Sequence, residues 1–195
     1  MSAPRPGAKL GVDKSFFIVY NKDVRLRKGE NKMECEAYLK EINSIVNEFT
    51  SKFGCKAFLN EEFYYYPALE AIEYTLDFGR PSKPNKEFLT SVRRHKPQVK
   101  LNLFTWCLLH ELGHHATEDD FDEEEMNRIN KKRARVIKTK AHLPYYNLPD
   151  ELAATTWAVN YANTHREEVL EFEDRIYHAV KRLKDFMSAR FPKKA

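Results

Sequence analysis

Residues 101–117 read LNLFTWCLLHELGHHAT, a stretch that is largely apolar in its first half and ends in three histidines. The spacing predicts a helix over 101–117, in which Leu103 and Cys107 share a stripe with His110 and His114. This apolar setting predicts a buried helix. Gly113 lies inside it and costs about 1 kcal/mol relative to Ala, which suggests that another backbone approaches closely there.

The segments around this helix predict an α+β fold. It would have a small antiparallel or mixed sheet of roughly three strands packed on helices, with a helical C-terminal part. Helices are predicted over 30–53, 149–165 and 166–190, strands over 16–20, 55–59 and 71–78, and a turn or short hairpin end over 61–67.

The length of 195 residues suits a single domain over 15–195, preceded by a flexible arm over 1–14 that is rich in Pro, Gly and Lys. No apolar run approaches the ~20 residues needed to cross a bilayer, and the start lacks the apolar segment of a secretory signal. Three cysteines, Cys35, Cys55 and Cys107, do not form a typical disulfide framework. We therefore expect a cytoplasmic protein without membrane contact.

His110-Glu-Leu-Gly-His114 is an HExxH motif. Positions i and i+4 lie on one helix face, so both imidazoles can bind one Zn²⁺ at about 2.0–2.1 Å. Glu111 is offset by about 100° and can take a proton from a zinc-bound water, as in metallopeptidases. The pattern fixes only three residues, however, and histidine pairs at this spacing also occur as ordinary surface or core residues.

A catalytic zinc needs a third protein ligand and an open position, and Glu151 is the strongest candidate. It falls in the first turn of the helix predicted over 149–165, and its face carries only small residues, which would let another helix approach: Ala154, Thr155, Ala158 and Ala162. Alternatively, Asp150 and Glu151 simply favour a helix N-terminus. The other candidates, which lack a suitable setting, are His115, His142, His165, His178 and Glu118.

The HExxH motif followed by Glu151-x-x-Ala154-x-x-Trp157-Ala158 resembles the ImmA/IrrE-type metallopeptidases, compact relatives of the gluzincins. The resemblance covers roughly residues 70–165. It implies a minimal gluzincin-like fold, with Glu151 as the third zinc ligand and a peptide bond in a protein as the substrate. Members of that family occur in phages and mobile elements, where some cleave repressors.

Two positions depart from the family pattern. Thr155 stands where the family has an Asn that supports a ligand histidine, and its hydroxyl could do so more weakly. The basic connector 79–100 replaces a short strand-to-helix connection. The sequence also shows no DNA-binding helix-turn-helix, which the family often carries.

Acyl transfer also needs a donor to the developing oxyanion. Tyr145 and Tyr146, held between two prolines in 143–149, are candidates, and His142 is another. The tyrosines can equally be packing aromatics in a loop. Upstream, the strand over 71–78 could offer its edge to an extended peptide, unless that edge is covered.

The formal net charge of +4 hides strong local charge. Seven acids fill 118–125, whereas 79–100 carries seven basic residues against one acid and 131–140 carries six basic residues and no acid. The basic clusters are either solvated helix faces or contacts for nucleic acid or an acidic protein partner. They motivate an alternative function, a non-catalytic zinc-containing binding module that contacts such a partner.

Overall fold

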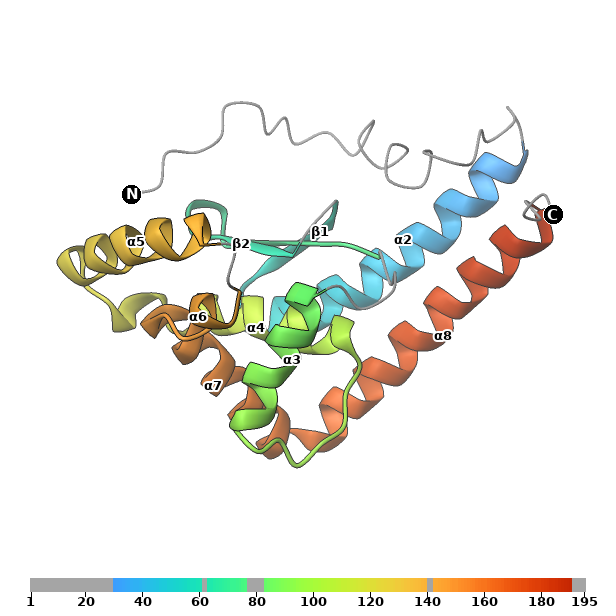
Figure 1. Ribbon diagram of the computed structural model, residues 1–195. Helices are drawn as coiled ribbons and strands as arrows, with labels where there is room; N and C mark the ends of the chain where they lie inside the picture. Colours follow the sequence, from blue (N-terminus) through green and yellow to red (C-terminus); the bar gives the residue numbers. More distant parts are fainter. Residues whose placement is uncertain (1–29, 61–62, 77–82, 140–141, 191–195) are drawn as a thin grey trace.

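A computed structural model describes residues 30–60, 63–76, 83–139 and 142–190. Within them the chain has the predicted α+β class and is mostly helical, with one small sheet (Figure 1). The arm predicted over 1–14 and the strand predicted over 16–20 lie outside the described residues. No described helix has the length and apolar character that crossing a membrane requires.

The HExxH motif lies on helix α4 (Leu103–Ala116), as predicted. The side chain of Asn102 caps the helix by accepting a hydrogen bond of 2.9 Å from the Thr105 N–H. Leu108, Leu109 and Leu112 are fully buried, so α4 lies in the core and holds the motif on a rigid element.

Helices α2 (Glu30–Thr50) and α8 (Arg166–Arg190) lie side by side (Figure 1). Three acids of α2, spaced seven residues apart, face arginines of α8 in the pairs Glu34–Arg190, Glu41–Arg182 and Glu48–Arg175. The predicted first helix ends with a 3-10 turn (Ser51–Phe53), after which Gly54 adopts a φ of +74°. That left-handed conformation favours glycine and turns the chain into the sheet.

The sheet is mixed, which was one of the two predicted forms. Its order is β1-β3-β2, where β1 (Lys56–Leu59) pairs parallel with β3 (Ala71–Tyr74) and β2 (Tyr64–Tyr66) pairs antiparallel with β3. The prediction that the strand over 71–78 offers an edge is wrong for β3, because both of its sides are paired. The outer strands are β1 and β2. Three consecutive tyrosines, which favour extended structure, make β2 a strand where a turn was predicted.

The segment 79–100 is not simply a connector. Helix α3 (Lys83–Arg94) occupies most of it, with Phe88 and Val92 buried at helical spacing. The segment was predicted to be a connector because it contains three prolines, which usually interrupt helices. Pro84 falls in the first turn of α3, where the missing N–H costs no hydrogen bond.

The acidic and basic runs meet in one helix, α5 (Glu123–Lys138). Asp122 caps it in a capping box with Glu125, so the acids fill its first turn and the basic residues its later part. This order suits the helix dipole. The acids just before it, Glu118–Asp120, form a 3-10 turn.

Helix α7 (Pro149–Thr164) packs directly against α4, and the short helix α6 (His142–Tyr145) precedes it. The small residues predicted to face a neighbour, Ala154, Thr155, Ala158 and Ala162, are all buried. A Cβ added to Gly113 would lie 2.3 Å from the Ala154 carbonyl oxygen. The predicted close backbone approach at Gly113 is therefore confirmed.

Candidate metal centre and active site

Three predicted ligands converge between α4 and α7. Glu151 Oε2 lies 3.1 Å from His110 Nε2 and 3.7 Å from His114 Nε2. One ligand-type atom from each of the three residues lies within 4.8 Å of the others. In a tetrahedral site with bonds of about 2.1 Å, donor atoms are about 3.4 Å apart, a value between the two carboxylate–imidazole distances. The three side chains are thus spaced to surround one small cation.

Thr155 fixes the proton position of His110. Its Oγ1 donates to the Glu151 carbonyl oxygen at 2.8 Å and lies 3.2 Å from His110 Nδ1. Because the hydroxyl has one hydrogen, the Nδ1–H must donate to Thr155, and Nε2 of the neutral ring then carries a lone pair. That lone pair faces the Glu151 carboxylate. A proton or a metal ion must lie between them, so the donor set fits a cation.

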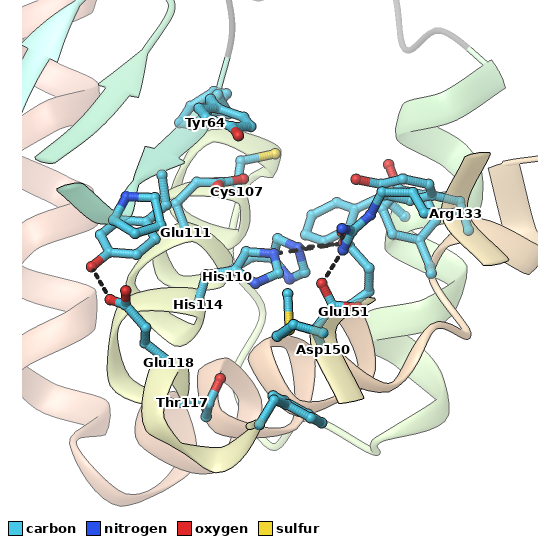
Figure 2. Close-up of a pocket in the computed structure, with 18 of the residues that line it drawn as sticks. Tyr64, Cys107, His110, Glu111, His114, Thr117, Glu118, Arg133, Asp150 and Glu151 are labelled. Atoms are coloured by element: carbon cyan, nitrogen blue, oxygen red, sulfur yellow. Dashed lines mark hydrogen bonds and ion pairs between the residues drawn. The ribbon is translucent and has the colours of Figure 1, made fainter. Parts of the chain in front are cut away.

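Arg133, from α5, approaches the other carboxylate oxygen of Glu151. Its Nη2 lies 3.5 Å from Glu151 Oε1 and also donates to Asp150 Oδ2. Glu151 is therefore held by a group other than the imidazoles, which fixes the direction in which Oε2 points (Figure 2).

The buried charges of this group support one another. Burial opposes ionisation of Glu151, but the hydrogen bond with His110 and the close approach of His114 hold the pKa of this carboxyl well below its usual range. Burial also opposes protonation of His114, yet the nearby Glu151 carboxylate raises the pKa of the imidazole overall. In the absence of a metal, the site therefore favours a carboxylate beside an imidazolium.

Glu111 lies on the same helix but is not one of the three converging side chains. Burial, the largest influence, raises the pKa of its carboxyl, while the two neighbouring imidazoles and a hydrogen bond from the Tyr65 backbone N–H lower it. The net rise moves the pKa of this carboxyl toward neutral pH, which makes the Glu111 carboxylate a better proton acceptor.

The ligand residues and Glu111 line one cavity of about 1270 Å³ (Figure 2). The cavity follows α4 from Leu103 past Cys107 and the histidines to Glu118, beyond the end of the helix. Aromatic residues line it near the start of α4, where Phe63 packs on Phe104, and beside His110, where Phe88 lies. The site is thus a long cleft with ligand residues part-way along it.

A hydrogen-bonded network fixes the far end of this cleft. The Tyr65 hydroxyl donates to Glu118 Oε2 at 2.8 Å and lies 2.7 Å from His115 Nδ1. His115 Nε2 lies 2.8 Å from the Phe53 carbonyl oxygen. His115 therefore points away from the ligands, as predicted, and joins α4 to the sheet.

The remaining predicted residues are placed as follows. Tyr145 and Tyr146 both line the cavity, and the Tyr146 ring centroid is 6.5 Å from that of His110. Their role as oxyanion donors stays a prediction. His165 stacks on Tyr161 and His178 pairs with Asp174 on α8. His142 begins α6, and its side chain lies outside the described set.

Arg133, Asp150 and Tyr65 are parts of the site that sequence reasoning missed. Arg133 was counted within a charged run, although Met126, Ile129 and Arg133 share one helical face and Ile129 is buried. That stripe could have marked Arg133 as inward-facing. Asp150 had been weighed only as a helix-terminus acid. Nothing in the sequence indicated that Tyr65 would reach the end of α4.

Comparisons with protein-family models, with curated proteins and with solved structures found no match. The assignment of His110, His114 and Glu151 as candidate metal ligands therefore rests on the sequence and geometry of this chain.

Proposed function

We propose that this protein is a zinc-dependent metallopeptidase of the gluzincin-like type, which hydrolyses a peptide bond in a protein substrate. One observation carries the proposal: His110, His114 and Glu151 converge from two helices, inside a cleft whose wall also contains Glu111. Two imidazoles and a carboxylate are a ligand set of catalytic zinc sites, as in thermolysin. The resemblance to ImmA/IrrE-type enzymes supports the same assignment.

In this proposal Glu111 is the general base and acid. Its raised pKa suits removal of a proton from the attacking water and later transfer of that proton to the leaving amine. When bound, zinc supplies Lewis acidity that polarises the scissile carbonyl and lowers the pKa of water. Tyr145 and Tyr146 are the candidate donors to the oxyanion.

Strand β2 is the segment best placed to bind an extended peptide. It is an outer strand of the sheet, and its residues Tyr64 and Tyr65 line the cavity. A substrate chain that adds to this strand would use backbone hydrogen bonds and leave alternate side chains free for recognition.

The test is Glu111→Gln, compared with Glu151→Ala. Glu111→Gln should keep zinc content near one ion per chain and lower peptide cleavage by roughly 10²–10⁴-fold, the usual size of general acid–base catalysis. Glu151→Ala should lower both zinc affinity and cleavage. Zinc content by mass spectrometry and cleavage of a denatured protein substrate would be measured on the same samples.

Retained cleavage in Glu111→Gln would remove this residue from the proposed role. Wild-type protein that binds no zinc would contradict the proposal as a whole. The alternative, a non-catalytic zinc-containing module that binds nucleic acid or an acidic partner through basic clusters, predicts zinc binding without cleavage in any variant.

A further inference from the structure

Carboxylates dominate the charge of the cleft. Six acidic side chains line it, namely Glu111, Glu118, Asp119, Glu123, Asp150 and Glu151. Arg133 is the only lysine or arginine among the described lining residues. Of the described lysines and arginines in the two basic clusters, only Arg133 therefore contributes to this surface.

The guanidinium of Arg133 is already engaged. Arg133 donates to Asp150 Oδ2, lies 3.5 Å from Glu151 Oε1 and donates to Asn130 Oδ1 at 2.7 Å. It neutralises the acids at the start of α7. An acidic substrate would have to compete with both carboxylates for the same guanidinium.

Several carboxylate oxygens remain available at the acidic end. Asp119 and Glu123 are exposed and have no hydrogen-bond or ion-pair partner among the described residues. Deeper in the cleft, Asp150 is only 7% exposed, and its Oδ1 has no partner within the described structure. A buried carboxylate oxygen without a donor is costly, so Asp150 Oδ1 is an acceptor that a water molecule or a donor group of a ligand can satisfy.

The opposite end of the cleft has a different character. Near the start of α4, Leu103 and Phe104 meet Phe63, whose ring centroid lies 5.5 Å from that of Phe104. No acidic residue of 118–123 can reach this end, because a 14-residue helix is about 21 Å long. The cleft thus has an apolar end, a central group of ligand residues and an acidic end.

We propose that the cleft selects a cationic peptide segment. A bulky apolar side chain would bind among Phe63, Leu103 and Phe104, and lysine or arginine side chains would bind at Asp119, Glu123 and Asp150. This inference rests on the proposed function and names its substrate class. It also argues against nucleic acid as the occupant, because phosphates would be repelled by the same carboxylates.

The first test measures binding separately from catalysis. Zinc-loaded Glu111→Gln protein would be titrated into two fluorescein-labelled peptides of equal length. Each carries one Phe, and they differ only in having Lys or Glu at the same positions on both sides of it. The Lys peptide should bind at least about tenfold more tightly at low salt, and the difference should shrink at high salt.

Two double variants locate the selectivity. Asp119→Asn with Glu123→Gln removes two acids that line the cleft, whereas Asp120→Asn with Glu124→Gln removes two neighbouring acids that do not. Both remove the same charge from the same run, 118–125. Only the first should lower the Lys preference, by about fivefold to tenfold if each exposed pair contributes its usual share.

Equal binding of the two peptides, binding of neither, or equal effects of the two double variants would overturn the proposal. Cleavage by wild-type protein is scored in a separate assay. A preference for the Lys peptide without any cleavage would contradict the proposed peptidase activity but support the cationic ligand. Cleavage without a preference for the Lys peptide would support the peptidase activity but contradict the cationic ligand.

Discussion

One hydroxyl group determines which nitrogen of His110 can bind a metal. Thr155 uses its only hydrogen on the Glu151 carbonyl oxygen, so it can only accept from His110 Nδ1. That leaves Nε2 unprotonated in the neutral ring and directed toward Glu151. Thr155, which would orient the imidazole, and His110 and Glu151, the candidate metal ligands, are therefore joined in one chain of contacts.

Replacing this hydroxyl by a methyl group should weaken metal binding without unfolding the protein. Thr155→Val keeps the size of the side chain but leaves Nδ1–H of His110 buried without an acceptor. Zinc affinity should fall by about 10–100-fold, the usual effect of losing such a supporting contact. It would be measured by competition with a chromophoric chelator.

Thr156 offers a matched control for that experiment. Its hydroxyl makes the same type of hydrogen bond, to the carbonyl oxygen four residues earlier. Thr156 does not line the cavity, however, and unlike Thr155 it is only partly buried. Thr156→Val should leave zinc affinity unchanged. If both variants weakened zinc equally, the loss would belong to the helix and not to His110.

At the scale of elements, the position of Glu151 depends on how closely α7 approaches α4. Gly113 permits this approach, since a Cβ there would meet the Ala154 carbonyl oxygen at 2.3 Å. Ala154 is completely buried, so the two backbones cannot separate without disturbing the core. The glycine of the HExxH motif thus contributes to the ligand geometry through packing.

Gly113→Ala should therefore destabilise the fold, despite the better helix propensity of alanine. The clash forces a backbone shift, which typically costs about 1–3 kcal/mol, and zinc affinity should fall because Glu151 moves with α7. Chemical denaturation and the chelator assay measure the two effects. Adding Ala154→Gly should not rescue the variant, because the clash is with the backbone carbonyl. Rescue would show that the Ala154 side chain, and not its carbonyl, sets the distance.

The elements that the sequence predicted well are those with a strong local pattern. Helix α4 and the small-residue face of α7 follow from spacing alone, whereas the close approach at Gly113 followed from the cost of a glycine inside a helix. Helix α3 was missed because three prolines outweighed its short apolar stripe. The pairing of β3 on both sides was missed because strand order depends on contacts between distant segments, which no local pattern contains.

At the scale of the whole molecule, charge is distributed so that acids line the cleft while most basic residues lie elsewhere. Lys131, Lys132, Arg135 and Lys138 on α5 are exposed, and among the described basic residues of 131–139 only Arg133 lines the cleft. From the sequence, the basic clusters were the more prominent candidates for choosing a partner. Which residues face the cleft depends on how α5 is rotated, and the proposed cationic ligand follows from this placement and not from the basic clusters.

Removing the metal should change how stability depends on pH. Without a cation, Glu151 contributes stability above its ordinary pKa near 4.5 and loses it as the pH falls through its lowered folded value. His114 contributes below its ordinary pKa near 6.5 and loses it as the pH rises through its raised folded value. The pair should therefore help the metal-free protein most between these two ordinary values and less toward pH 8.

The stabilisation that zinc provides should increase with pH, because zinc competes with protons for the histidines. The increase in Tm on adding zinc should grow as the pH rises from about 6 to about 8, because fewer protons then compete with the ion. Thermal unfolding of chelator-treated and zinc-loaded protein across this range measures both trends. His178→Gln removes an exposed histidine on α8 and should leave both pH dependences unchanged. Glu151→Gln should reduce the pH dependence of the metal-free Tm and of the zinc-induced shift in Tm. A zinc-induced shift in Tm that is the same at every pH would mean that the ion binds without displacing protons, and so not at His110 and His114.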